Sequence, residues 1–188
     1  MAEQDRQLAA LDGVREVIDG RDVLRFERRI GHPVERVWEA LTSPDQISQW
    51  LEAQEVHIEL VAGGRFDTRT TGPPELVEAI IREAGEAALQ SNDTVLRVEP
   101  PHILEHTFGG NPASVVRWEL LPDGGGCLLR LMHTEPTDFQ DENAPRDLAG
   151  WHVLLEQLEK LLEGTPAGFS MERWEGYKEG YAAKLEIG

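Results

Sequence analysis

The fold is decided by residues 102–133, which read HILEHTFGGNPASVVRWELLPDGGGCLLRLMH. In this stretch three runs rich in apolar residues are separated by short turns at 109–112 and 122–125. Connections this short join antiparallel neighbours, because a parallel pair needs a crossover of a dozen or more residues. The stretch therefore predicts three strands of an antiparallel meander: 102–108, 114–121 and 126–133.

Strand patterns continue toward the N-terminus. Asp19-Gly20 separates two apolar runs, and an Asp-Gly pair of this kind is a strong hairpin signal. Gly63-Gly64 separates two further runs in the same way. The predicted strands upstream of the meander are 14–18, 23–30, 56–61, 65–70 and 94–99.

Helical patterns interrupt the strands and follow them. The longest begins near Asn143, and Leu148, Trp151, Leu155 and Leu158 form its apolar stripe up to Gly164. Shorter helices are predicted at 33–41, 43–51, 73–90 and 170–185, and residues 3–12 are expected to form a short helix or an arm.

These elements predict an α+β protein with a helix-grip fold, in which a curved antiparallel sheet surrounds a long C-terminal helix. We expect one domain over residues 1–188, with its core at about 14–164. The segment 73–90 is then a helical insertion and 170–185 an extra C-terminal helix. We expect the insertion to lie across the open end of the sheet, with its apolar side chains toward a cavity mouth or a partner: Val77, Ile80, Ile81 and Ala84.

A series of short motifs follows the predicted elements over residues 22–164. They are Arg25-Phe26-Glu27-Arg28-Arg29, Pro33, Arg36, Trp38, Thr42-Ser43-Pro44, Trp50, Gly63-Gly64-Arg65-Phe66, Glu99-Pro100-Pro101, Trp118-Glu119-Leu120, His133, Gly150-Trp151, Leu155 and Leu158. In order and spacing this series resembles the family of homologues of the activator of heat-shock-protein-90 ATPase, within the START-like (SRPBCC) superfamily. The resemblance implies an internal cavity and no shared catalytic residue.

The amino-acid composition limits the classes of partner that the protein can bind. The net charge of −17 opposes binding to nucleic acids and to anionic membrane surfaces, both of which recruit Lys and Arg. No stretch reads as a signal peptide or as a membrane span of roughly 20 apolar residues. We therefore expect a cytoplasmic protein that binds neither nucleic acid nor membrane. Because the helices at 73–90 and 170–185 have apolar faces, we also expect a homodimer.

Residue types that carry catalysis or bind metals are sparse. His102, His106 and His133 could converge on neighbouring strands, but the one cysteine, Cys127, lies in an apolar run and zinc needs three or four converging ligands. Neither a phosphate-binding loop nor a nucleophile elbow is present. We expect no metal site, no cofactor and no identifiable catalytic set.

The predicted cavity is thus the candidate site. Inward strand positions and the apolar faces of the helices nominate eight ligand-binding residues: Trp38, Trp50, Phe66, His106, Trp118, His133, Trp151 and Leu155. His106 and His133 stand out, since a polar group in an apolar pocket needs a partner and can orient a ligand.

Three functions stay open. The first is binding of a small apolar or amphipathic ligand, which an enclosed cavity would support. The second is a co-chaperone-like or regulatory protein-interaction module, which an exposed apolar patch on the helix at 73–90 or 170–185 would support. The third is a cavity-based enzyme, such as a cyclase or hydrolase, which a buried ionisable pair with perturbed pKa values would support.

Overall fold

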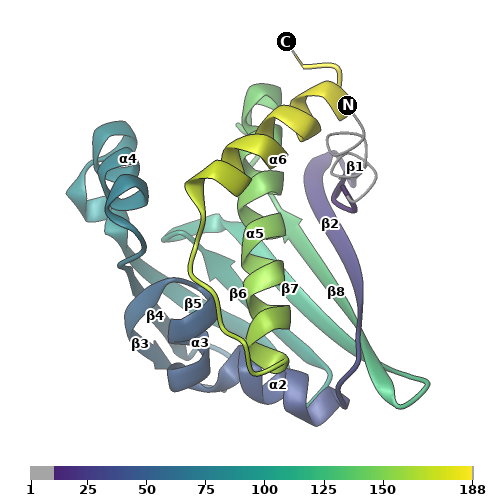
Figure 1. Ribbon diagram of the computed structural model, residues 1–188. Helices are drawn as coiled ribbons and strands as arrows, with labels where there is room; N and C mark the ends of the chain where they lie inside the picture. Colours follow the sequence, from purple (N-terminus) through teal and green to yellow (C-terminus); the bar gives the residue numbers. More distant parts are fainter. Residues whose placement is uncertain (1–10, 188) are drawn as a thin grey trace.

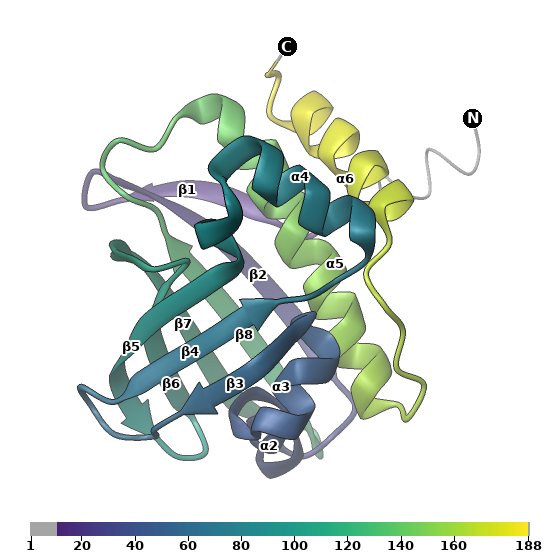
Figure 2. The same ribbon diagram turned by 90° about the vertical axis from the view of Figure 1, so that its left-hand side faces the viewer.

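A computed structural model describes residues 11–187 of the chain. Its centre is a curved eight-stranded antiparallel sheet with the order β1-β2-β8-β7-β6-β5-β4-β3 (Figures 1 and 2). The strands span Val14–Ile18 (β1), Arg21–Ile30 (β2), Ala53–Ile58 (β3), Arg65–Thr70 (β4), Gln90–Glu99 (β5), Ile103–Phe108 (β6), Asn111–Asp123 (β7) and Gly126–Thr134 (β8). The arm or helix predicted over 3–12 lies outside the described residues, apart from residues 11 and 12.

Helix α5, Ala144–Leu162, crosses one face of this sheet, as Figure 1 shows. The predicted stripe is its buried face: Leu148, Trp151, Leu155 and Leu158 are all buried. Two short helices, α2 (Val34–Thr42) and α3 (Pro44–Trp50), cover the lower end of the sheet in Figure 2. The sequence predicts this arrangement, a curved sheet wrapped around one long helix.

The alternation of buried and exposed residues in β7 sets the inner face of the sheet. Val116, Trp118 and Leu120 are buried, whereas Arg117 and Glu119 between them lie on the outer face and form an ion pair. Side chains two residues apart in a strand share a face. Ser114 therefore points inward too, and it is buried.

The segment after β4 differs in part from the prediction. It forms helix α4 (Pro74–Ala84) and a short 3-10 turn, η1 (Glu86–Leu89), but β5 begins at Gln90 and includes the residues expected to end the helix, 91–93. The reason is Asp93, whose buried carboxylate accepts hydrogen bonds from Thr107 Oγ1 at 3.0 Å and Gly110 N at 3.1 Å. These bonds hold the strand against its neighbours, so residues 91–93 continue β5 instead of ending the helix.

Helix α6, Met171–Lys184, packs along α5 and is tied to the start of β1. Ser170 caps it by accepting a hydrogen bond from Arg173 N. Near its end the buried Tyr181 hydroxyl accepts a hydrogen bond from Gly13 N at 3.0 Å, and the same oxygen lies at hydrogen-bond distance, 2.8 Å, from His152 Nδ1. Gly13 is needed there, because a Cβ would lie 2.5–2.7 Å from the Phe26 ring and the tyrosine oxygen.

Replacing Tyr181 with phenylalanine is expected to lower the free energy of unfolding by about 1–3 kcal/mol, because two buried polar groups, Gly13 N and His152 Nδ1, lose their partner. Burial lowers the pKa of His152 to about 4, so its ring is neutral at pH 7. Urea denaturation measures the change. A loss below about 0.5 kcal/mol would show that the hydroxyl does not hold α6 in place.

Candidate functional site

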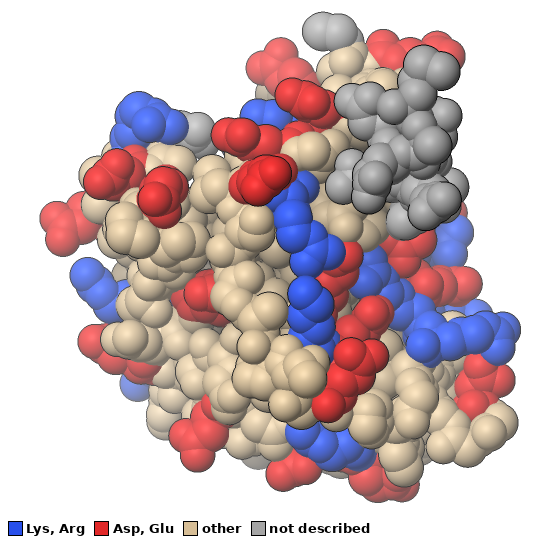
Figure 3. Space-filling model, in the orientation of Figure 1, with Lys and Arg blue, Asp and Glu red and all other residues tan. Residues whose placement is uncertain are grey.

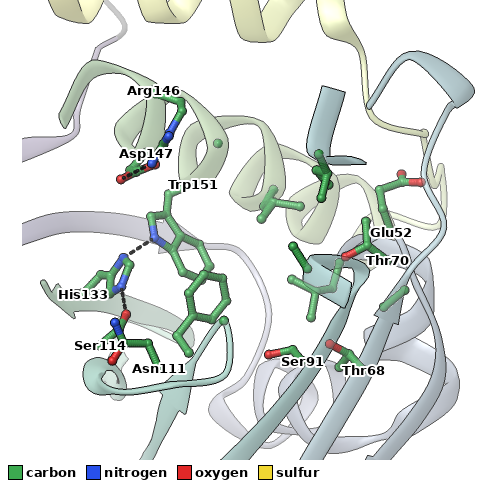
Figure 4. A pocket seen from close by; sticks show the side chains of 18 of the residues that line it. Glu52, Thr68, Thr70, Ser91, Asn111, Ser114, His133, Arg146, Asp147 and Trp151 are labelled. Atoms are coloured by element: carbon green, nitrogen blue, oxygen red, sulfur yellow. Dashed lines mark hydrogen bonds and ion pairs between the residues drawn. The ribbon is translucent and has the colours of Figure 1, made fainter. Parts of the chain in front are cut away.

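A pocket of about 680 Å³ lies between the inner face of the sheet, α5 and α4. Figure 4 shows it from close by. Its walls are largely apolar, and eight phenylalanine and tryptophan side chains belong to them: Trp50, Phe66, Phe108, Trp118, Phe139, Trp151, Phe169 and Trp174.

The aromatic rings form a continuous wall. Trp118 packs edge to face against Trp50 and against Trp151, each with ring centroids 5.7 Å apart. Phe108 lies 5.0 Å from Trp151 and 5.2 Å from the His133 ring. Such edge-to-face pairs stabilise beyond simple area burial, so this wall is a firm surface rather than a loose one.

Gly150 leaves part of the pocket open. It lies inside α5 next to Trp151, and no atom comes within 4 Å of the position that a Cβ would occupy. A glycine inside a helix costs roughly 0.5–1 kcal/mol relative to alanine. Close packing does not require this glycine, and its effect is to keep space in the pocket.

One end of the pocket carries a chain of hydrogen bonds, drawn as dashed lines in Figure 4. The indole of Trp151 donates to His133 Nδ1 at 3.0 Å, and His133 Nε2 lies 2.7 Å from Ser114 Oγ. Glu135 Oε1 lies 3.1 Å from the same Nδ1. Ser114, His133 and Glu135 are all buried, with 4–5% of each residue exposed.

The indole fixes the proton on His133. An indole N–H can only donate, so Nδ1 accepts and the imidazole proton lies on Nε2. Burial lowers the pKa of His133 to about 3, which keeps the ring neutral. Nε2–H therefore donates to Ser114 Oγ.

This tautomer decides what the site can do chemically. Ser114, His133 and Glu135 follow one another as nucleophile, base and acid do in a hydrolase triad. In a triad, however, the acid holds the proton on Nδ1, so that Nε2 can accept the serine proton. Here Trp151 imposes the opposite tautomer. The arrangement orients the Ser114 hydroxyl and does not activate it.

Glu135 is held in its protonated form. Desolvation in its buried position, together with the negative charge of Asp147, raises its pKa to about 8, although Arg146 opposes this. Among the described residues its Oε1 has no hydrogen-bond partner. An ionised carboxylate here would also face the lone pair of His133 Nδ1, so the protonated form suits the geometry.

His106 has both ring nitrogens engaged. Its Nδ1–H donates to the carbonyl of Thr107 at 2.6 Å, and its Nε2 accepts from the indole of Trp118 at 3.2 Å. Burial lowers its pKa, so the ring is neutral. Its role is to hold Trp118 in the aromatic wall.

Hydroxyl groups lie on the opposite wall of the pocket. Thr68 and Thr70 of β4 and Ser91 of β5 line it, facing the His133 end across the aromatic side chains (Figure 4). Glu52 lies on the same side; its Oε1 accepts a hydrogen bond from Phe169 N at 2.7 Å, and burial raises its pKa. The pocket thus has an apolar middle between two polar walls.

Helix α4 forms the remaining wall, with a face slightly different from the predicted one. Leu76, Ala79, Ile80 and Ala84 line the pocket. Of the predicted set, Ile80 and Ala84 are among them, whereas Val77 is half-buried outside the lining and Ile81 is 41% exposed. The helix presents the neighbouring stripe because Leu76 packs beside Gly72, where a Cβ would lie 2.8 Å from the leucine.

The structure brings six of the eight nominated residues together around the pocket: Trp50, Phe66, His106, Trp118, His133 and Trp151. The other two lie elsewhere. Trp38 is half-buried on α2 and packs against the core, and Leu155 is a fully buried core residue of α5. The helical spacing of Trp38 and Leu155 predicts that they are at least partly buried. It does not distinguish a residue that packs in the core from one that lines the pocket.

Sequence reasoning missed Ser114, Glu135 and Gly150. Strand parity could have found the first two, since Ser114 shares the inward parity of Trp118, and Glu135 that of His133. A polar residue at an inward position is the signal. Gly150 stands inside a strong helical pattern, and that placement is also unusual.

Metal-ligating and charged side chains are dispersed over the described residues. In the part of the chain that the structure describes, no group of three His, Cys, Asp or Glu side chains could hold a metal ion. Acidic and basic side chains are interspersed on the face in Figure 3, without the extended basic area that nucleic acid requires. Among residues 11–187, no helix has the length and apolar character to cross a membrane.

Comparison with known structures shows the same fold. A conserved protein of unknown function from Enterococcus faecalis, EF2215, superimposes with a TM-score of 0.71 at 18% identity, over 97% of this chain and 96% of that one. CalU16 from Micromonospora echinospora gives 0.64 at 26% identity, over 92% and 95%. The BPP1335 protein from Bordetella parapertussis gives 0.64 at 28% identity, over 94% and 90%.

A family model matches a shorter part of the chain than the structural comparisons cover. Residues 31–163 match the family model described as Activator of Hsp90 ATPase homolog 1-like protein. The match spans both short helices, the insertion, the meander and α5, and so includes most of the pocket lining. No curated protein matches the chain.

Proposed function

The chain belongs to the family of activator of Hsp90 ATPase homolog 1-like proteins, and from this premise we propose that it binds a small apolar or amphipathic molecule in the pocket beneath α4. The observation that carries the proposal is the pocket itself. Its volume of about 680 Å³ falls within the roughly 300–1,000 Å³ typical of ligand sites. Aromatic walls with a few buried polar groups are the usual composition of such sites.

The unfilled space at Gly150 supports the same proposal. Close-packed interiors leave few voids larger than a water molecule. A pocket that coincides with a helical glycine, whose Cβ position has no neighbour within 4 Å, indicates space reserved for a guest.

The alternative of a protein-interaction module is less well supported. It requires an exposed apolar patch on one of the two extra helices. Among the described residues of α4 and α6, Ile81 is the one large apolar side chain that is strongly exposed. The apolar face of α4 lines the pocket, and that of α6 packs against α5. Ligand binding is therefore the function that the geometry favours.

Substituting Gly150 tests the proposal. Gly150→Leu is expected to place its side chain in the pocket and to weaken binding of Nile red, an uncharged fluorescent probe, by about tenfold or more, since the apolar contacts of the probe are displaced. Fluorescence titration measures the affinity. The same variant should be no less stable than the wild type, because leucine favours the helix.

Gly176→Leu is the matched control. Gly176 lies inside α6, is exposed, and also has no atom within 4 Å of its Cβ position. This variant gains the same helix propensity without reaching the pocket, so its affinity for Nile red should equal that of the wild type. Equal affinities in all three proteins would contradict binding in the pocket.

A further inference from the structure

The hydrogen-bond balance at the Ser114 end of the pocket specifies a ligand chemistry. Resting on the proposed function, we propose that the pocket selects an uncharged ligand with a flat apolar body and a carbonyl oxygen, which accepts hydrogen bonds from Ser114 and Glu135.

Ser114 is a donor without an acceptor. Because Trp151 occupies Nδ1, His133 donates through Nε2 and fills a lone pair of Ser114 Oγ. The hydroxyl hydrogen of Ser114 is then left over, and among residues 11–187 this oxygen makes no other hydrogen bond. The hydroxyl lines the pocket, so its hydrogen is available to a guest.

Glu135 supplies a second donor. Its carboxyl group is buried, lines the pocket and carries a proton when a neutral Nδ1 faces it at 3.1 Å. The single lone pair of Nδ1 already accepts from the Trp151 indole. The carboxyl proton therefore also lacks an acceptor of its own.

A carbonyl oxygen complements this pair of donors. It has two lone pairs and brings no hydrogen that would need an acceptor in turn. Leaving buried donors unpaired costs free energy, so a ligand that pairs them binds more tightly than an apolar isostere.

Charge selects against ionised ligands of either sign. A carboxylate ligand would meet Asp147 in a protein with a net charge of −17, and the neighbouring Arg146 already forms an ion pair with Asp147. A cation would find Glu135 protonated and the imidazole of His133 without a free lone pair. The aromatic wall of Trp118, Trp151 and Phe108 favours a flat apolar body beside the carbonyl.

Four probes of similar shape test the inference: 2-acetylnaphthalene, 2-ethylnaphthalene, 2-naphthoate and 2-naphthylmethylammonium. Isothermal titration calorimetry with the full-length protein is expected to show that the ketone binds about tenfold more tightly than the ethyl compound, which is the gain from one well-formed hydrogen bond. Both ions should bind more weakly than the ketone.

Two variants locate the effect. Ser114→Ala should remove most of the preference for the ketone, measured as the ratio of the affinities for 2-acetylnaphthalene and 2-ethylnaphthalene. Thr68→Val is the matched control, because it removes a hydroxyl from the opposite wall of the same pocket and should keep the preference. If Ser114→Ala fails to fold, infrared spectroscopy of the wild-type complex provides the same test, since the carbonyl stretch should shift to lower wavenumber than in heptane.

The outcomes separate the two proposals. Failure of all four probes to bind would overturn the proposed function. Equal binding of ketone and ethyl compound, or preferred binding of the ammonium or the carboxylate, would leave pocket binding standing and overturn the carbonyl assignment. A ketone preference that survives Ser114→Ala would equally overturn it.

Discussion

Replacing Trp151 with alanine is expected to lower the free energy of unfolding by about 3–5 kcal/mol, the usual cost of truncating a fully buried tryptophan. Only 3% of Trp151 is exposed, and its ring packs against Phe108, Trp118 and His133. The substitution also removes the indole hydrogen bond from His133 Nδ1. Urea denaturation followed by circular dichroism measures the loss.

Trp174→Ala is the matched control for this prediction. Trp174 also lines the pocket, but it lies half-buried on α6. Its truncation should cost clearly less, about 1–2 kcal/mol, because less apolar area leaves water on folding. A melting temperature of Trp151→Ala that equals that of the wild type would refute the packing described for α5.

The second large effect concerns Glu135 and depends on pH. The folded state raises the pKa of this carboxyl group to about 8, mainly by desolvation. Between its ordinary value near 4.5 and about 8, the unfolded chain is ionised here while the folded protein keeps the proton. The folded state thus binds more protons, and the contribution of Glu135 to stability is complete below pH 4.5 and is lost as pH rises toward 8.

Glu135→Gln removes the stability loss that the wild type shows as pH rises, because an amide does not titrate. We expect the stability of the variant relative to the wild type to rise by roughly 1.4 kcal/mol per pH unit in this window, about 2–3 kcal/mol between pH 5 and pH 7. Urea denaturation at pH 5, 6, 7 and 8 measures it. His133 and His152, whose lowered pKa values act in the opposite direction, are present in both proteins and largely cancel.

A substitution of an exposed acid controls for general effects of charge. Glu172→Gln on α6 removes the same number of formal charges and measures the general effect of losing one exposed acidic group. A stability difference between Glu135→Gln and the wild type that stays constant with pH would mean that the carboxyl group is ionised in the folded protein. The donor count around His133 would then be wrong.

The helix-grip fold was predictable because both periodicities are explicit in the sequence. The predicted strand at 114–121 places Trp118 at an inward position, and the spacing of Leu148, Trp151 and Leu155 predicts the inner face of α5. Both predictions are confirmed. Local patterns suffice here, because each element buries the face that its own period defines.

The polar end of the pocket was harder to predict, since it depends on contacts between strands. The register pairs Val115 with Thr134, and its continuation by one residue brings Ser114 opposite Glu135. Parity predicts that each residue points inward but not that the two face one another. The tautomer of His133 depends on a third element, because Trp151 comes from α5.

The sequence predicts the inserted helix but not which of its faces lines the pocket. The sequence predicts an amphipathic helix, and α4 is one. Two stripes, through Val77 and Ile81 or through Leu76 and Ala79, are nearly equal in apolar character. Packing against the pocket decides between them, and no property of the helix alone does.

Binding of a small molecule in the pocket can be followed through the indole N–H signals of the five tryptophans in a ¹⁵N-labelled protein titrated with Nile red. Trp50, Trp118, Trp151 and Trp174 line the pocket, whereas Trp38 packs elsewhere against the core. We expect the first four signals to shift and saturate together while the signal of Trp38 stays in place. Unchanged spectra at high probe concentration, or a shift of the Trp38 signal without the other four, would contradict binding in the pocket.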